Sequence, residues 1–186
     1  KIAKDYKKAG AKCLSILTER NFFGGDISFI PKVKEKVDLP VLRKDFIVDE
    51  WQIYESNFFG ADCILLILSI LDDFKLLKFY ETAYELGMDV ICEVHNEEEL
   101  SRALKYKLKC IGINNRNLKN LKIDLDTFDR LNQKIPKNVI KICESGIHHN
   151  RQLEMFSNQG ADAFLIGEYL MKSNNILNST QSLIKK

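Results

Sequence analysis

The chain has 186 residues, of which 45% are apolar and 29% are charged. This length and composition fit a globular domain and exclude a disordered chain, a collagen-like chain and a disulfide-stabilised miniprotein. The 28 basic residues nearly balance the 26 acidic ones, and a net charge of +2 argues against the broad basic surface of nucleic-acid-binding proteins.

The sequence contains no long apolar run and no signal peptide, so we expect a cytoplasmic protein with no membrane segment. Its five cysteines are odd in number, include no CxxC pair, and each lies in or beside an apolar run. We therefore expect small buried residues in a reducing compartment rather than disulfides or metal ligands.

Seven short runs rich in Ile, Val, Leu and Cys recur along the chain. Continuous apolar runs without polar alternation are typical of strands that are covered on both faces, as in a parallel sheet. The predicted strands are Ala11–Leu17, Leu39–Leu42, Cys63–Leu68, Asp89–Glu93, Cys110–Ile113, Val139–Cys143 and Ala163–Ile166.

The stretches between these runs place apolar residues at helical spacing. The predicted helices are a segment around Tyr6, then Asp49–Phe59, Asp72–Leu86, Asn96–Tyr106, Leu125–Gln133 and Asn150–Asn158, with a further helix opening at Glu168. Side chains suited to N-caps, and glycines suited to helix C-termini, stand at the expected ends. The caps are Asp72, Asn96 and Asp124, and the glycines are Gly60, Gly87 and Gly160.

A Gly-Ala pair precedes three of the predicted strands, at Gly10, Gly60 and Gly160. The spacings of 50 and 100 residues correspond to two and four strand–helix units of 25 residues each. A constant unit favours an α/β fold of the (β/α)8 TIM-barrel class, with an open doubly wound sheet as the alternative. We expect a single barrel domain over residues 1–186 that contains seven of the eight strands.

Polar side chains follow several predicted strands directly, namely Lys44, Glu93, Asn114, Arg116 and Glu144. The carboxyl ends of the strands carry the active site in a barrel of this class. A lysine near two carboxylates can donate a proton while the carboxylates balance its charge or move protons. Any one of these residues alone would be explained by a solvated loop charge or a structural ion pair, but five at corresponding strand ends indicate a catalytic site.

Two glycine-containing loops follow the last two predicted strands, at Ser145-Gly146 and at Gly167. Backbone N–H groups in the corresponding loops of this fold commonly bind phosphate, which predicts an anion site here. The alternative is that both glycines serve tight turns only. A phosphate beside Glu168 would be repelled unless that carboxylate pointed away.

Phe22, Phe23 and Phe46 follow strand ends and either wall an apolar pocket for a ring-bearing substrate or pack in the outer core. His95, two residues after Glu93, is either a catalytic base or a loop histidine. Trp51 is expected to serve packing rather than function.

Taken together in this order, the motifs resemble the indole-3-glycerol-phosphate synthase family. The matching segments are Cys13–Glu19, Phe22–Gly25, Leu42–Val48, Gly60–Leu66, Glu93–Glu97, Gly112–Leu118, Glu144–Ile147 and Phe164–Glu168. Each segment alone is weakly specific, whereas the whole series with these spacings is highly specific.

The resemblance implies ring closure of 1-(2-carboxyphenylamino)-1-deoxyribulose 5-phosphate, a small phosphorylated substrate, with loss of CO₂ and water and without cofactor or metal. It implies that Lys44 is a cationic acid and that Glu93 and Glu144 are active-site carboxylates, with Glu93 moving protons in the dehydration. It assigns Asn114 and Arg116 to substrate positioning. The other implied binding residues are Ser145, Gly146 and Gly167 around the phosphate, and Ser15, Phe23, Phe46, Leu65, Leu118 and Leu165 along the pocket.

The family also carries a catalytic Glu and Lys and a phosphate-contacting Ser on and after its first strand, and no such segment stands in this sequence. We therefore expect weak or no activity from the 186-residue chain, and self-association through unpaired edges of the first and last strands. The alternatives are an inactive barrel fragment and a phosphate-binding barrel like phosphoribosylanthranilate isomerase. An isomerase needs only one acid and one base, which disfavours the second alternative.

Overall fold

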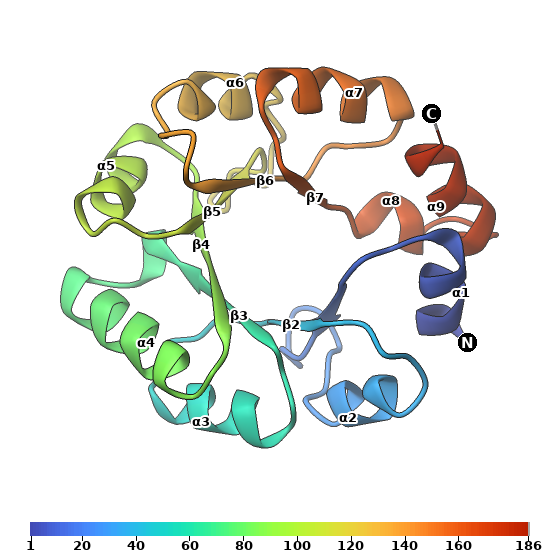
Figure 1. Cartoon of the computed structure of the whole chain (residues 1–186), viewed down its shortest axis with the longest axis horizontal. Coiled ribbons are helices and arrows are strands. Elements are labelled where there is room, and N and C mark those ends of the chain that lie inside the picture. The colour runs from blue at the N-terminus through green and yellow to red at the C-terminus, as the bar shows by residue number, and fades with distance from the viewer. Residues whose placement is uncertain (186) are drawn as a thin grey trace. The chain divides into compact units, whose positions relative to one another are not determined.

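The computed structural model describes residues 1–185 of the chain. Contacts within the chain divide it into two compact units, unit 1 (Lys1–Ile91) and unit 2 (Cys92–Lys186), and each is described by itself. Parallel strands alternate with helices in both units, as Figure 1 shows. The expectation of one domain over the whole chain stays a prediction.

The strands of unit 1 run parallel and lie in sequence order, β1 beside β2 and β2 beside β3. The elements are α1 (Ile2–Ala9), β1 (Leu14–Leu17), α2 (Phe29–Lys34), β2 (Val41–Lys44), α3 (Trp51–Phe58), β3 (Cys63–Ile67), a 3₁₀ turn at Leu68–Ile70 and α4 (Asp73–Glu85). Helix α2 packs on β2 and α4 packs on β3. This packing buries the central residues of β3 almost completely.

Strand β4 (Asp89–Val94) begins at the end of unit 1 and continues into unit 2. From there β5 pairs with β4, β6 with β5 and β7 with β6, all in parallel. The remaining elements are α5 (Glu97–Lys105), β5 (Cys110–Asn114), α6 (Asp126–Asn132), β6 (Ile140–Glu144), α7 (Asn150–Gln159), β7 (Ala163–Leu165), α8 (Glu168–Met171) and α9 (Ile176–Ile184). An open doubly wound sheet reverses its strand order at a switch point, and neither unit contains such a reversal.

All seven predicted strands are present, with shifts of a few residues at their ends. The first strand begins at Leu14 instead of the predicted Ala11, and the second, predicted at Leu39–Leu42, is shifted at both ends to Val41–Lys44. Its last two residues stay in the ladder because Arg43 and Lys44 pair with the last two residues of β1. Lys44 therefore ends the strand instead of lying in the loop beyond it.

The predicted helix caps are confirmed at Asp72 and Asn96, whose side chains accept the N–H groups of Lys75 at 2.8 Å and Glu99 at 2.9 Å. The prediction for Asp124 is wrong, because α6 begins two residues later with Leu125 at its cap. Asp124 instead accepts the N–H of Asp126 at 3.1 Å. Gly60, Gly87 and Gly160 all have positive φ, as predicted for helix C-termini.

The prediction that the cysteines are buried is confirmed for only some of them. None of the five cysteines forms a disulfide, and Cys92 and Cys143 are buried, but Cys13 is exposed and the other two are half-buried. Cys13 lies just before β1 rather than inside it. No helix within residues 1–185 is long and apolar enough to cross a membrane.

Candidate active site

The ladder register of unit 2 brings three candidate residues to one face of its sheet. Asn114, Glu144 and Leu165 end β5, β6 and β7 and pair with one another across the ladder. Glu93 pairs with Gly112, two residues before Asn114 on β5. Because side chains alternate along a strand, Glu93 shares the face of the other three. Glu93 and Glu144 are each 1% exposed, so both carboxylates are almost completely shielded from solvent.

Glu93 lies against a histidine that is itself held by a second carboxylate. His95 Nε2 lies 3.0 Å from Glu93 Oε1. The two groups are not aligned as in a regular hydrogen bond, so the contact is an ion pair. His95 Nδ1 lies 3.0 Å from Glu99 Oε2. Burial lowers the pKa of His95, but the two carboxylates outweigh burial and raise that pKa to about 9. His95 is therefore an imidazolium at neutral pH.

The loop after β5 is tied down by two consecutive asparagines. Asn114 Oδ1 accepts the N–H of Arg116 at 2.9 Å. Asn115, which is 2% exposed, donates to the carbonyl of Ser145 at 3.2 Å and accepts the N–H of Phe128 at 3.1 Å. Asn115 thus joins the ends of β5 and β6 to α6, and this fixes the backbone around Asn114.

The loop after β6 has an unusual backbone at both of its predicted phosphate residues. Ser145 and Gly146 have φ values of +65° and +80°. A Cβ on Gly146 would lie 2.7 Å from side-chain carbons of both Ile123 and Leu125. Glycine is strongly favoured here, because a side chain would be strained at this φ and would force the Ile123 and Leu125 side chains to shift. The Gly146 carbonyl is held by Gln152 Nε2 at 3.2 Å.

The Glu168 carboxylate, which would repel a phosphate, is neutralised within unit 2. It forms ion pairs with Arg116 and with Lys172, the second at 2.6 Å. Hydrogen bonding from Lys172 and the charge of Arg116 lower the pKa of Glu168. Gly167 precedes it as the N-cap residue of α8. Arg116, predicted to position substrate, is thus already engaged by a carboxylate.

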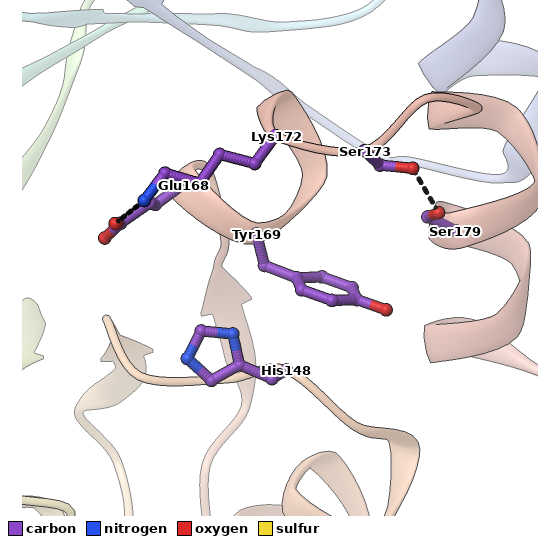
Figure 2. A pocket seen from close by; sticks show the side chains of 6 residues that line it. All are labelled: His148, Glu168, Tyr169, Lys172, Ser173 and Ser179. Carbon is purple, nitrogen blue, oxygen red and sulfur yellow. Dashed lines mark hydrogen bonds and ion pairs between the residues drawn. The ribbon is translucent and has the colours of Figure 1, made fainter.

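A pocket beside α8 adjoins these loops, and Figure 2 shows the side chains around it. The lining residues are His148, Glu168, Tyr169, Lys172, Ser173 and Ser179. The His148 ring meets the Tyr169 ring edge-on with 5.5 Å between centroids, and the hydroxyls of Ser173 and Ser179 are 2.6 Å apart. The sequence argument gave His148 no role, whereas the structure places it in this pocket wall.

In unit 1 the register likewise groups the predicted residues on one face. Lys44 pairs with Leu17 on β1, and Ser15 on the same strand pairs with Leu42. Leu42 in turn pairs with Cys63 on β3, so alternation puts Ser15, Lys44 and Leu65 on the same face. Leu65 is 1% exposed, while Ser15 is exposed and Lys44 is half-buried.

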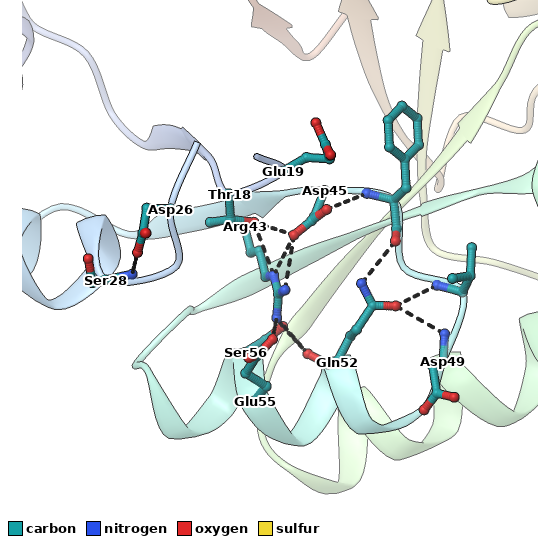
Figure 3. A network of polar contacts seen from close by, with 12 residues as sticks. Thr18, Glu19, Asp26, Ser28, Arg43, Asp45, Asp49, Gln52, Glu55 and Ser56 are labelled. Atoms are coloured by element: carbon teal, nitrogen blue, oxygen red, sulfur yellow. Dashed lines mark hydrogen bonds and ion pairs between the residues drawn. The ribbon is translucent and has the colours of Figure 1, made fainter. Parts of the chain in front are cut away.

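A buried arginine, which the sequence argument did not single out, organises the loop after Lys44. Arg43 is 4% exposed and points to the opposite face, toward α3. Its guanidinium forms an ion pair with Asp45 at 3.0 Å and donates to the Gln52 carbonyl at 2.9 Å (Figure 3). Asp45 also accepts the hydroxyl of Thr18 and, at 2.8 Å, the N–H of Phe46. The network fixes the backbone on both sides of Lys44.

The three phenylalanines form a small cluster at the carboxyl ends of β1 and β2. The Phe46 ring centroid lies 6.4 Å from that of Phe22 and 6.2 Å from that of Phe23. Phe22 and Phe23 are 80% and 54% exposed, so they are not outer-core residues. Their exposure favours the first of the two predictions for these side chains, an accessible apolar wall, over packing in the outer core. In unit 2, Leu118 is exposed and Leu165 is half-buried.

Sequence signals for the overlooked residues were present but ambiguous. The spacing of Asn96 and Glu99 is that of a helix-capping pair, and the capping pair explains why Glu99 turns back toward His95. Arg43 begins a charged run that follows an apolar run. At such a position the sequence pattern does not distinguish a buried arginine from a solvated one. Within the described part of the chain, no group of three or more His, Cys, Asp and Glu could hold a metal ion.

Known proteins resemble this chain along almost its whole length. Residues 1–183 match the family described as indole-3-glycerol phosphate synthase. A protein of that name from Legionella pneumophila (strain Paris) is 49% identical over 183 residues, which cover 98% of this chain and 71% of the relative. One from Caldanaerobacter subterraneus subsp. tengcongensis is 52% identical over 171 residues, with 92% and 66% coverage.

Solved structures of more distant sequence share the fold. The 3-hexulose-6-phosphate synthase from Salmonella typhimurium superposes with a TM-score of 0.79 at 14% identity, over 97% of this chain and 89% of that one. Orotidine 5'-phosphate decarboxylase from Pyrococcus horikoshii gives 0.73 at 12% identity, over 98% and 89%. The predicted (β/α)-barrel class, with seven strands within residues 1–185, is confirmed. The chain belongs to the indole-3-glycerol phosphate synthase family, whose members are carboxy-lyases of tryptophan biosynthesis.

Proposed function

We propose that the reaction of this chain is the conversion of 1-(2-carboxyphenylamino)-1-deoxyribulose 5-phosphate into indole-3-glycerol phosphate, CO₂ and water. The expectation of weak or no activity stays a prediction. The family match supports this reaction. Among the structural features, the strongest support is the shared sheet face of Glu93, Asn114 and Glu144 at the carboxyl ends of their strands. That end of the strands is where barrel enzymes carry their chemistry.

The reaction needs an acid, a base and an anion site. A bond forms between the ring carbon that bears the carboxylate and the carbonyl carbon of the sugar chain. The carboxylate then leaves as CO₂, and its electron pair restores the aromatic ring. The former carbonyl oxygen, now a hydroxyl, takes up a proton and leaves as water, while the neighbouring methylene loses a proton to complete the indole.

We assign these proton transfers to residues at the strand ends. Lys44 supplies the cationic acid that polarises the carbonyl and attracts the substrate carboxylate. Glu93 moves the protons of the dehydration, and Glu144 is the second carboxylate that balances charge during the reaction. Asn114 positions the substrate through an amide that the Arg116 N–H holds in place.

The phosphate is assigned to backbone N–H groups around Ser145, Gly146 and Gly167. The positive φ of Ser145 and Gly146 forms a tight loop in which N–H groups can face an anion. The pairing of Glu168 with Arg116 and Lys172 supports this assignment, because it removes the repulsion of a lone carboxylate beside the loop. The family resemblance implies further substrate-binding residues, which are Ser15, Phe23, Phe46 and Leu65 in unit 1 and Leu118 and Leu165 in unit 2.

The test is a turnover assay that supplies the anilino-deoxyribulose phosphate and follows the fluorescence of the indole product. Glu93→Gln, Glu144→Gln and Lys44→Met should each lower kcat by about 10²–10⁴-fold, the usual contribution of an acid–base group. Glu98→Gln and Lys8→Met are matched controls on exposed helix positions and should leave kcat unchanged.

Retention of kcat within twofold by both glutamine variants would refute the catalytic roles. Absence of substrate binding by a folded chain would favour a non-enzymatic barrel instead. The five cysteines, none of which forms a disulfide, support a reducing, cytoplasmic compartment. Self-association through strand edges stays a prediction, and a light-scattering mass of a monomer at high concentration would contradict it.

A further inference from the structure

Glu93 belongs to a chain of three buried charged side chains in unit 2. The exposed fractions of the Glu93, His95 and Glu99 side chains are 1%, 9% and 11%. His95 stands between the two carboxylates, with one ring nitrogen 3.0 Å from each. The turnover chemistry assigned above uses Glu93 and leaves the other two without a role.

The far end of this chain is anchored to the helix α5. Glu99 Oε2 accepts the backbone N–H of His95 at 2.8 Å, and Glu99 Oε1 accepts from Asn96 Nδ2 at 2.7 Å. The Glu99 N–H donates back to Asn96 Oδ1 at 2.9 Å. The Glu99 carboxylate is thereby fixed by the first turn of the helix and cannot follow a movement of the histidine.

The two contacts of His95 favour a ring in which both nitrogens carry protons. A neutral imidazole has one N–H and one lone pair, so it would turn a lone pair toward one of the carboxylates. The imidazolium avoids this repulsion and attracts both sides, and the raised pKa of about 9 agrees with that form. The geometry is therefore that of a charged bridge between a fixed carboxylate and Glu93.

We propose that His95 is a positioning residue for Glu93, holding its carboxylate in the orientation for proton transfer by bridging it to the helix-anchored Glu99. The inference rests on the proposed function, which gives Glu93 its proton-transfer role. His95 has no acid–base role toward the substrate in this inference, because each ring nitrogen lies 3.0 Å from a carboxylate.

A double-mutant cycle separates this role from a general structural one. His95→Ala should lower kcat by about 10- to 100-fold with little change in KM, since misplacement of a reacting group by about 1 Å has effects of this size. In a Glu93→Gln background the same substitution should change kcat less than twofold. His95→Gln, which keeps an amide donor near Glu93, should retain more kcat than His95→Ala.

Equal losses from His95→Ala in both backgrounds, or no loss in the unmutated chain, would overturn the inference while leaving the role of Glu93 intact. Full activity of Glu93→Gln would instead overturn the role of Glu93 itself. Thermal unfolding of every variant identifies losses that come from unfolding.

A spectroscopic readout is independent of turnover. Histidine side-chain ¹⁵N NMR of the 186-residue chain should show both His95 nitrogens protonated at pH 7. Glu93→Gln should shift the Nε2 resonance more than the Nδ1 resonance, and Glu99→Gln should do the reverse. Glu98→Gln, on an exposed position of the same helix, should shift neither. A neutral His95 at pH 7 would overturn the inference.

Discussion

Replacing Gly146 by alanine tests whether the loop after β6 depends on glycine for space as well as for backbone conformation. Gly146 has a φ of +80°, and a Cβ there would lie 2.7 Å from Ile123 Cγ2 and from Leu125 Cδ2. Both neighbouring carbons belong to side chains that follow β5, so either those side chains or the loop would have to shift. Gly87 is a matched control, with a φ of +77° and nothing within 4 Å of its Cβ position.

The two substitutions share one energetic cost and differ in the other. An alanine in the left-handed region costs about 1–2 kcal/mol at either position. Overpacking adds about 1–3 kcal/mol at Gly146 only. We therefore expect Gly146→Ala to reduce the free energy of unfolding by about 2–5 kcal/mol and Gly87→Ala by about 1–2 kcal/mol.

Urea unfolding followed by circular dichroism measures both values, with the m-value confirming that the transition itself is unchanged. Because Gly146 lies in the proposed phosphate loop, its alanine variant should also raise KM for the substrate, whereas Gly87→Ala should not. Equal destabilisation of the two variants, within about 0.5 kcal/mol, would refute the spatial argument.

Three further predictions follow from the charged and polar groups described above. The pKa of His95 rises from 6.5 to about 9 on folding, so the unmutated chain should exceed His95→Gln in unfolding free energy by up to about 3 kcal/mol below pH 6.5. That advantage should fall between pH 6.5 and 9 and vanish above, and a flat difference in urea titrations across this range would contradict it. Arg43→Met leaves the Asp45 carboxylate buried without its cation, at 8% exposure, and should cost about 3–5 kcal/mol in chemical unfolding; a loss under 1 kcal/mol would show that Asp45 is compensated elsewhere. Asn115→Ala leaves the Phe128 N–H and the Ser145 carbonyl without their amide partner and should cost about 1–3 kcal/mol, with faster amide exchange at Phe128 as its signature.

The strand–helix order was readable from the sequence because most of the strands contain a short continuous apolar run. The run at Cys63–Ile67 shows this well, since nearly all of its residues are buried. Strand ends were less certain, because apolar character does not stop where pairing stops. Lys44 illustrates the difference, since a charged residue stays in the ladder through its backbone bonds to β1. Helix α9 was not predicted, as its Asn, Ser and Thr residues have weak helix propensity and packing on α7 and α8 supports it instead.

The sequence by itself determined the family and which of the strands carry polar residues near their carboxyl ends, because both depend on residue types in a fixed order. Only the tertiary structure decided which partners those residues meet. The bridge from Glu93 through His95 to Glu99 and the network around Arg43 join residues through burial and side-chain direction. Such contacts depend on how deeply each side chain is buried. A sequence pattern does not reveal the burial of a charged residue, because the same residue type at the same spacing occurs on exposed surfaces as well.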